Sequence, residues 1–330
     1  MTFRAAPMMT RLTRRFERRP LVRPNLAYFL WRFAANGART LRASSTRHAF
    51  ADSPAIARTL TGDGIVVGPA SGFLSDEGRD ALDAATSQVA AKSRSDKVQA
   101  VLSGAAPPKG TKEFRIDLIS QGIAGESPLL RVALDRRLLE IVASYLGMWP
   151  CLHSVGAWLN YPTPTAATSS QLWHNDPEDL KIVKAFIYLD EVKADNGPFT
   201  YIPGTHPFGR HVARGARCHA RRLDDAAIRA VFDETEWRVC TGPTHTMILA
   251  DTLGFHRGGK PTAGTRMLIT FTYTSGTPLV QPSIWLKETP SWVSLPIQRA
   301  AVERLGTTAP VKPAKAKSDG PPASATAASL

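Results

Sequence analysis

Two side chains that can bind a metal ion lie close together in one short segment of the sequence. His174 and Asp176 are two positions apart in the segment Leu172-Trp-His-Asn-Asp-Pro177. In extended backbone, residues i and i+2 point to the same side, so these side chains can converge on one point. Standing alone, the motif is explained more simply by a hydrogen-bonded His–Asp pair, and a third ligand is needed to favour a metal.

Among the eight histidines, His256 is best placed to be that third ligand. It comes shortly after the apolar run 246–250 and directly before Arg257 and two glycines. Two histidines and one carboxylate occupy one face of an octahedron around Fe(II) and leave three positions open for oxygen chemistry. Tetrahedral zinc accepts the same three ligands, although no motif for the general base of a zinc hydrolase is evident. The ligand types therefore predict a metal site and leave the metal open.

An arginine stands where it could bind a carboxylate in the same cleft. Arg266 begins the β-branched and aromatic run 266–273, ten residues after His256. A guanidinium fork pairs with a carboxylate in a fixed geometry, and a buried arginine without an anion is costly. If Arg266 points inward, a dicarboxylate cosubstrate is the fitting partner. A surface arginine at a strand edge explains the position equally well.

Taken together, these motifs resemble the phytanoyl-CoA dioxygenase family of Fe(II)/2-oxoglutarate-dependent oxygenases over about residues 60–285. The motifs are His174-x-Asp176, Asp195-Asn-Gly-Pro-Phe-Thr-Tyr-Ile-Pro-Gly-Thr-His206, Asp251-Thr-Leu-Gly-Phe-His256-Arg-Gly and Arg266. The resemblance implies a double-stranded β-helix, that is, a jelly-roll or cupin-like barrel. It also implies that His174, Asp176 and His256 bind iron and that Arg266 pairs with the far carboxylate of 2-oxoglutarate.

The resemblance implies a reaction as well. Family members consume O2, decarboxylate 2-oxoglutarate to succinate and hydroxylate a C–H bond of a second substrate. In related halogenases a small residue replaces the carboxylate of the metal site, so the presence of Asp176 favours hydroxylation. We expect a small-molecule or lipid-like substrate, and the sequence does not indicate a CoA-binding motif.

Several aromatic and polar residues near these motifs are candidates for contacts in the pocket. Phe186 matches a position that lies beside the cosubstrate in some family members, and it is a candidate cosubstrate-binding residue. Lys184 and Tyr188 share its face by the two-residue period, and that face can instead be ordinary core. Trp158, Asn160 and Tyr161 precede the His-x-Asp motif in the sequence, and they are placed to touch cosubstrate or substrate. A packed aromatic is an equally good explanation of Trp158.

The elements that must position these residues follow from composition. We expect a mainly β protein with flanking helices and one domain, 51–307, whose first part, 51–150, is helical and whose β core spans 151–285. Apolar spacing predicts helices over 78–91 and 128–147. Short β-branched and aromatic runs between Gly, Pro and Asn predict the strands of a sandwich or barrel.

The positive charge of the chain is concentrated at its N-terminus. Residues 1–50 contain eleven Arg and one acid, Glu17, whereas 51–307 contain 27 basic and 26 acidic side chains. A nearly neutral body gives no basic groove, so we expect no nucleic-acid partner for the domain. The arm 1–50 can lie on an anionic membrane surface, or it can be a helix that covers the core while its arginines stay solvated. The tail 308–330, rich in Pro, Ala, Lys and Ser, is expected to be disordered.

A function of another class stays open: a non-catalytic jelly-roll scaffold that its basic arm directs to membrane or RNA. Three separated cysteines without a CxxC pair fit a reducing compartment, and with no clear export signal we expect a cytoplasmic protein. The segment 208–236 can be a lid whose arginines select acidic substrates, or a solvated face. Its arginines are Arg210, Arg214, Arg217, Arg221 and Arg222. Arg257 can contact an anionic substrate or form a salt bridge. The oligomeric state is not predicted.

Overall fold

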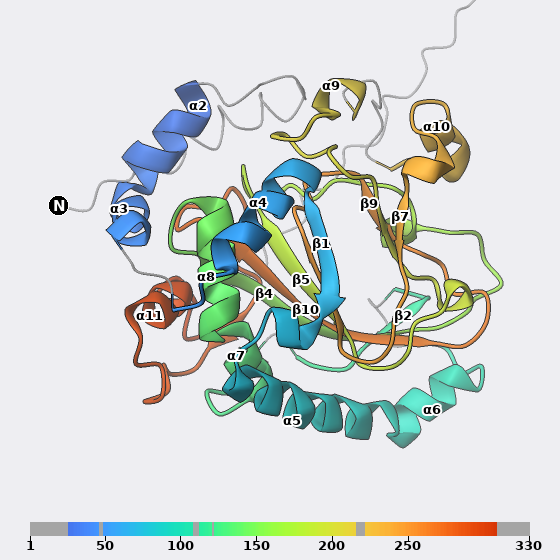
Figure 1. Ribbon diagram of the computed structural model, residues 1–330. Helices are drawn as coiled ribbons and strands as arrows, with labels where there is room; N and C mark the ends of the chain where they lie inside the picture. Colours follow the sequence, from blue (N-terminus) through green and yellow to red (C-terminus); the bar gives the residue numbers. More distant parts are fainter. Residues whose placement is uncertain (1–25, 46–48, 108–111, 121, 216–221, 309–330) are drawn as a thin grey trace, which may run out of the picture.

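The computed structural model describes most of the chain (Figure 1). The described residues are 26–45, 49–107, 112–120, 122–215 and 222–308. The predicted arm is therefore described from residue 26 onward apart from 46–48, and the predicted disordered tail lies outside the described residues from 309. Within the described ranges, no helix combines the length and the apolar character needed to cross a bilayer.

A six-stranded antiparallel sheet forms the centre of the molecule, in the order β1-β8-β5-β10-β4-β2. Its strands are β1 (Ile65–Pro69), β2 (Arg115–Asp117), β4 (Cys151–Asn160), β5 (Val183–Tyr188), β8 (Thr246–Ala250) and β10 (Arg266–Thr274). The strand β10 pairs with both β4 and β5, which places Arg266 opposite Asn160 and Thr270 opposite Phe186. One of the two central strands, β10, therefore begins at the predicted carboxylate-binding arginine.

Two smaller sheets accompany the large one. The first contains β7 (Arg238–Cys240), β6 (Phe199–Tyr201) and β9 (His256–Gly258), in that order, and the second pairs β11 (Trp285–Leu286) with β3 (Gly122–Ile123). The strand pairing does not join these sheets to the large sheet in one closed barrel. The described residues therefore form a large antiparallel sheet with helices, a coarser architecture than the predicted barrel.

Helices surround the sheets and are concentrated before residue 147. The α-helices are α2 (Leu26–Phe29), α3 (Gly37–Ser45), α4 (Ser53–Asp63), α5 (Asp76–Ser93), α6 (Asp96–Leu102), α7 (Pro128–Ala133), α8 (Arg136–Leu146), α9 (Val212–Gly215), α10 (Asp225–Arg229) and α11 (Pro296–Val302). Shorter 3-10 or π turns are η1 (Leu30–Ala35), η2 (Ala70–Gly72), η3 (Ser169–Gln171), η4 (Ala194–Asn196) and η5 (Glu234–Glu236).

The expectation of one helix over 128–147 is wrong. The segment forms two helices, α7 and α8, because Asp135 leaves the helical conformation and accepts a hydrogen bond from the backbone N of Leu138. An aspartate in this N-cap position satisfies an orphan amide and begins a new helix. The apolar spacing continues through the break, since side chains of both helices are buried in the same core.

The large sheet has one apolar face and one mixed face, as the two-residue period of strands requires. In Figure 1, α8 and the small sheet with β7 and β9 lie on opposite sides of β5 and β10. Side chains that pack with the helices are Ala157, Leu159, Ala185, Ile187, Leu249, Ile269 and Phe271. Side chains of the other face line a cavity, among them Trp158, Lys184, Phe186, Leu268, Thr270 and Thr272.

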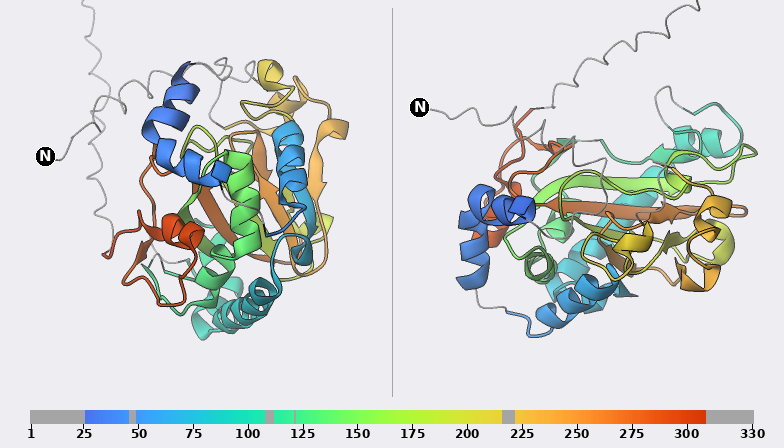
Figure 2. Two further views of the ribbon diagram at one scale, coloured as in Figure 1. Left: turned by 60° about the vertical axis from the view of Figure 1, so that its left-hand side comes forward. Right: turned by 90° about the horizontal axis from the view of Figure 1, so that it is seen from above.

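The helices at the N-terminal end are fixed to the body by polar side chains. Figures 1 and 2 place α2 and α3 at one end of the molecule, near α11. Trp31 is 2% exposed and donates a hydrogen bond of 3.0 Å to Asp179. Arg39 is buried and bonds to backbone carbonyls and to Glu303. The expectation that the arginines of this helix stay solvated is therefore wrong for Arg39.

Candidate metal centre and pocket

The three predicted metal ligands lie together on one side of the cavity. One ligand atom from each of His174, Asp176 and His256 lies within 4.8 Å of the other two. The Nε2 atom of His256 is 3.3 Å from Asp176 Oδ2, and that of His174 is 3.8 Å from Asp176 Oδ1. The two histidines, 82 positions apart in sequence, are held in register by an antiparallel bridge between His174 and His256, with N–O distances of 2.9 and 3.1 Å.

Backbone carbonyls fix the tautomer of both histidine rings. The Nδ1 atom of His174 lies 2.8 Å from the carbonyl oxygen of Leu172, and Nδ1 of His256 lies 2.9 Å from that of Gly254. A carbonyl oxygen only accepts, so each Nδ1 must carry the proton. In the neutral ring this leaves the lone pair on Nε2, the atom that faces Asp176, which is the arrangement usual for metal-binding histidines.

Burial keeps His174 neutral, whereas charged and hydrogen-bonding neighbours keep Asp176 ionised. Burial, with the nearby His256, lowers the pKa of His174 to about 3. Burial alone would raise the pKa of Asp176, but Lys184 and the two histidines hold it well below its usual value. A neutral imidazole at His174 beside the ionised carboxylate of Asp176 is the combination of protonation states that a divalent cation requires.

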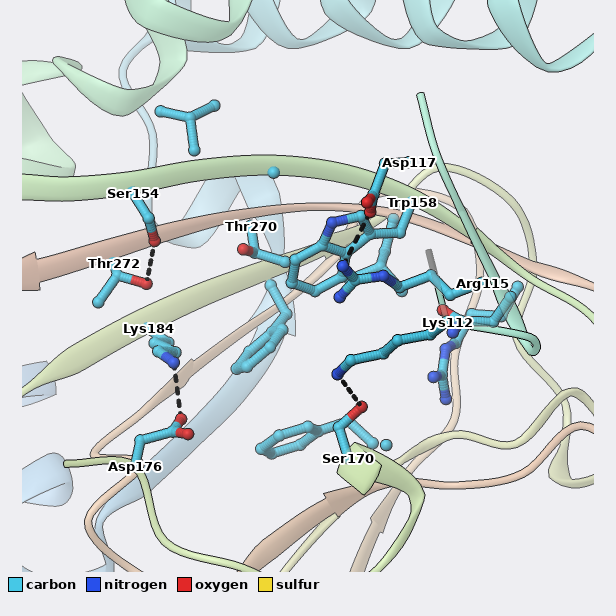
Figure 3. A pocket seen from close by; sticks show the side chains of 18 of the residues that line it. Lys112, Arg115, Asp117, Ser154, Trp158, Ser170, Asp176, Lys184, Thr270 and Thr272 are labelled. Carbon is cyan, nitrogen blue, oxygen red and sulfur yellow. Dashed lines mark hydrogen bonds and ion pairs between the residues drawn. The ribbon is translucent and has the colours of Figure 1, made fainter. Parts of the chain in front are cut away.

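A lysine that the sequence placed on this face forms an ion-pair network with the site. The Nζ atom of Lys184 is 2.7 Å from Asp176 Oδ2 and 3.0 Å from Glu178 Oε1 (Figure 3). Burial would lower the pKa of Lys184, but Asp176 and Glu178 raise it above its usual value. Lys184 therefore stays charged and orients the carboxylate of Asp176.

Arg266 points into the cavity, as the carboxylate-binding interpretation of the sequence requires, and is not a surface arginine. It is 4% exposed, and its Nε and Nη1 atoms have no hydrogen-bond partner among the described residues. A buried guanidinium without partners is costly, because these donors lose their bonds to water. The residue opposite it on β4, Asn160, likewise has a buried Oδ1 without a partner. This end of the cavity therefore has unused hydrogen-bonding capacity.

A cavity of about 410 Å³ joins Arg266 to the metal ligands along the inner face of β10. Phe186, Trp158 and Asn160 line it, together with Tyr188. The ring of Phe186 packs against Phe199, with centroids 4.5 Å apart. Tyr161 is buried, and its hydroxyl donates to the carbonyl of Glu113. Tyr161 is not among the residues that line this cavity, so the structure gives the sequence expectation of a pocket contact there no support.

Comparison with known families decides which family the sequence represents. The sequence profile of the phytanoyl-CoA dioxygenase (PhyH) family matches residues 5–249. The chain belongs to the phytanoyl-CoA dioxygenase family. Members of this family are Fe(II)/2-oxoglutarate-dependent oxygenases, which confirms the prediction of an enzyme that uses iron and 2-oxoglutarate. The match ends before His256 and Arg266, so their assignment within this PhyH chain depends on the geometry described above.

Solved structures similar to this PhyH chain include EctD, SnoK and SnoN. EctD from S. alaskensis is 22% identical, with a TM-score of 0.45, over 68% of this chain and 79% of that chain. The carbocyclase SnoK from nogalamycin biosynthesis is 17% identical, with a TM-score of 0.46, over 73% and 88%. The epimerase SnoN from the same biosynthesis is 16% identical, with a TM-score of 0.44, over 69% and 82%. No curated protein sequence is a significant match.

Several of the remaining candidate residues of this PhyH chain have partners of their own, and Arg217 and Arg221 lie outside the described residues. Arg257 forms an ion pair with Asp225 and lies over the ring of Trp173, so its salt-bridge explanation is the one that the structure supports. In the segment 208–236, Arg214 pairs with Glu236. Three further histidines lie outside the metal centre and contact other groups: His153 the carbonyl of Val280, His206 that of Thr61, and His245 the hydroxyl of Thr86.

Three charged residues of the pocket were not found from sequence. Lys112, Arg115 and Asp117 come from β2 and the residue stretch before it, and they line the wall of the cavity opposite Lys184 (Figure 3). Arg115 pairs with Asp117 at 2.9 Å and lies over the ring of Trp158. The alternation of Arg115 and Asp117 around Ile116 is a strand signal, but only the pairing of β2 with β4 brings it to the site.

Proposed function

We propose that this family member hydroxylates a C–H bond of a small-molecule or lipid-like substrate, using Fe(II), 2-oxoglutarate and O2. In this proposal His174, Asp176 and His256 hold the iron, Arg266 binds the far carboxylate of 2-oxoglutarate, and Phe186 packs beside it. The observation that carries the proposal is the convergence of three ligand side chains in the same cavity as a buried arginine with two unpaired nitrogens.

The residues present fit both groups. The two histidines offer Nε2 lone pairs toward one carboxylate, and this set of ligands leaves positions open on an octahedral metal. A carboxylate beside Arg266 would satisfy its free Nε and Nη1 atoms. Glycine at position 258 keeps the space beside the guanidinium open, because a Cβ there would lie 3.1 Å from Arg266 Nη2.

Iron with 2-oxoglutarate and O2 supplies, when bound, the oxidant that converts a C–H bond to an alcohol, with release of succinate and CO2. The protein's residues bind and orient the reactants. Lys184 holds Asp176 in place, and Arg266 fixes the cosubstrate at the far end of the cavity. The aromatic rings of Phe186, Phe199 and Tyr188 exclude water from the space between these ends.

The fold is part of the same proposal. We infer that the large sheet and the sheet β7-β6-β9 are the two halves of a jelly-roll barrel, within one domain over 51–307. Supporting this, a shared apolar cluster lies between the two sheets, with Phe186, Tyr188 and Ile248 from one and Phe199 and Tyr201 from the other. The isolated bridge from His174 to His256 connects the loop before β5 to β9.

The proposal is tested by adding Fe(II) and then 2-oxoglutarate to the metal-free protein without oxygen. A chelated 2-oxo acid gives a visible charge-transfer band, which we expect in the wild type. The band should be absent in His174→Ala and His256→Ala, because each loses a histidine ligand. With oxygen admitted, the wild type should release succinate.

His211→Ala is the matched control, because this histidine lies outside the cavity. It should form the band as the wild type does. Iron binding without a band, or a band that survives in His174→Ala or His256→Ala, would contradict the proposed site. Absence of iron binding altogether would favour the alternative of a non-catalytic scaffold directed to membrane or RNA by residues 1–50.

A further inference from the structure

The charged side chains of the cavity differ in whether the protein supplies their partners. Of the cations that line it, Arg115 is paired with Asp117, and Lys184 is paired with Asp176 and Glu178. Arg266, assigned above to 2-oxoglutarate, and two others, Lys112 and Arg222, form no ion pair with any described residue. A role for these two cations rests on the proposed function, which supplies the positions of the metal and the cosubstrate.

With iron and 2-oxoglutarate bound, the charges around the metal would balance without Lys112 and Arg222. The two charges of Fe(II), together with Lys184 and Arg266, equal the charges of Asp176, Glu178 and the two carboxylates of 2-oxoglutarate. Buried charges are stable when they are matched in this way. With iron and cosubstrate bound, the excess positive charge of the cavity therefore resides on Lys112 and Arg222.

Both cations converge on one short turn at the rim of the cavity. Lys112 donates a hydrogen bond of 3.3 Å to Ser170 Oγ (Figure 3), and Arg222 donates to the carbonyl of Ser169. This turn is capped by its own side chains, because Gln171 Oε1 accepts a hydrogen bond of 3.1 Å from the backbone N of Thr168. Two side chains from distant parts of the chain are thus held at one place by neutral acceptors only.

The electrostatics of Lys112 indicate a place for an anion. Burial, followed by the charges of Arg115 and Arg222, lowers the pKa of Lys112 to about 8. Arg222 also contributes to lowering the pKa of His174, and Asp176 acts on that of Lys112, so both cations lie within electrostatic range of the metal ligands. A bound anion would relieve the repulsion between the two cations.

We propose that Lys112 and Arg222 form a subsite for an anionic group of the substrate, a carboxylate or a phosphate. The ammonium of Lys112 offers donors from inside the rim, and the exposed fork of Arg222 closes over the group from outside. Held at this point, the rest of the substrate extends along Trp158 toward the metal ligands. Of the alternatives for the segment 208–236, this assigns the selection of acidic substrates to Arg222.

The experiment compares ligands that differ only in charge. Hexyl phosphate, hexanoate and 1-hexanol are titrated calorimetrically into the full-length protein, with and without anaerobic Fe(II) and 2-oxoglutarate. We expect the wild type to bind one of the two anions and to bind it more tightly than the alcohol. Preference for hexyl phosphate or for hexanoate identifies the group as phosphate or carboxylate.

Variants locate the binding. Lys112→Gln and Arg222→Gln should each weaken the affinity for the preferred anion by about tenfold or more, since each removes charged hydrogen bonds. The variant Lys112→Arg, which keeps the charge, should restore part of the affinity. Matched controls are Lys193→Gln and Arg210→Gln, whose side chains pair outside the cavity with Glu191 and Asp63 and should bind the anion as the wild type does. Arg222 is exposed, so its variant is informative even if Lys112→Gln fails to fold.

Three results would overturn the subsite. The first is equal binding of the anions and the alcohol, and the second is an anion affinity that the two variants leave unchanged. The third is a loss of the 2-oxoglutarate absorbance band in Lys112→Gln, which would assign this lysine to the cosubstrate. Because the band reports on iron and 2-oxoglutarate independently of hexyl phosphate, failure of the subsite is distinguishable from failure of the proposed function.

Discussion

Two buried arginines, one at the N-terminal end of the molecule and one in the pocket, differ in how their donors are used. Arg39 is 7% exposed and donates to the carbonyls of Trp149, Pro150 and Ala300 at 2.8–3.0 Å, and to Glu303. Arg266 is 4% exposed, and its Nε and Nη1 atoms have no partner among the described residues. The donors of the first are satisfied by the protein itself, whereas we propose that those of the second are satisfied by the cosubstrate.

This difference separates stability from function. Removing an arginine whose partners are buried leaves those partners without a bond and destabilises the fold. Removing an arginine that has no partners takes away a desolvated charge, and an apolar replacement can leave the fold equally stable. The burial of the two side chains is nearly the same, so burial alone does not distinguish the two roles.

The largest effect on stability is expected at Arg39. The substitution Arg39→Ala should lower the free energy of unfolding by about 3 kcal/mol, because three carbonyls and Glu303 lose their donor. Urea unfolding measures this loss. The exposed Arg58 provides the control, and Arg58→Ala should change the free energy by less than about 0.5 kcal/mol. Equal losses in the two variants would remove the distinction between the arginines.

At Arg266 we expect a large effect on 2-oxoglutarate binding and little effect on stability. The substitution Arg266→Leu should raise the 2-oxoglutarate concentration that half-saturates the absorbance band by about a hundredfold. In the absence of ligand, its free energy of unfolding should equal that of the wild type or exceed it by about 1 kcal/mol. The variant Arg266→Lys keeps the charge without the fork and should bind 2-oxoglutarate with intermediate affinity. A strongly destabilised Arg266→Leu would contradict the comparison.

Asp179, a buried acid that contacts the N-terminal helices through Trp31, is intermediate between the two arginines in how the protein satisfies it. Asp179 accepts hydrogen bonds from Trp31, Leu180 and Ser275, but no cation pairs with it among the described residues. Burial raises its pKa from 3.8 to about 7. Between these pH values the folded protein holds a proton that the unfolded chain has released. The stability that Asp179 contributes is therefore complete below about pH 4 and is lost as the pH rises toward 7.

The expected fall in stability with rising pH can be tested with a variant that keeps a hydrogen-bonding side chain at position 179 but cannot ionise. Stability measured by urea unfolding from pH 4 to 7 should fall more steeply with pH in the wild type than in Asp179→Asn. The difference between the slopes should approach about 1.4 kcal/mol per pH unit, the value for one proton. Identical slopes would mean that the three donors already keep Asp179 ionised in the folded protein.

The smallest effect is expected where an arginine pair is exposed. Arg210 lies 3.3 Å from Asp63, with its side chain 65% exposed. Surface pairs contribute little because water screens them, so Arg210→Ala should cost about 0.5 kcal/mol or less. A thermal or urea unfolding curve indistinguishable from that of the wild type meets this expectation, and a loss comparable to that of Arg39→Ala would contradict it.

The metal centre could be predicted from the sequence because its signals are local. His174 and Asp176 are two residues apart, His256 follows shortly after the apolar strand β8, and Arg266 begins the strand β10, whose β-branched and aromatic pattern is visible in the sequence. The position of Lys112 and Arg115 in the cavity is not a local property of the sequence, because it depends on the pairing of β2 with β4. Arg39 was expected to be solvated because its acceptors lie more than a hundred positions away in the chain.

The bridge between His174 and His256 has a consequence for how such a protein can change. Their backbone hydrogen bonds fix the separation of the two ligands, whatever the chain does between them. The segment 208–236 lies within that interval and contributes Arg222 to the rim. Insertions, deletions or exchanges in this segment can therefore alter which molecule is accepted while the metal site keeps its dimensions. The candidate ligands and the proposed anion subsite thus belong to different segments of the chain, which makes the segment 208–236 the natural place for directed evolution of substrate choice.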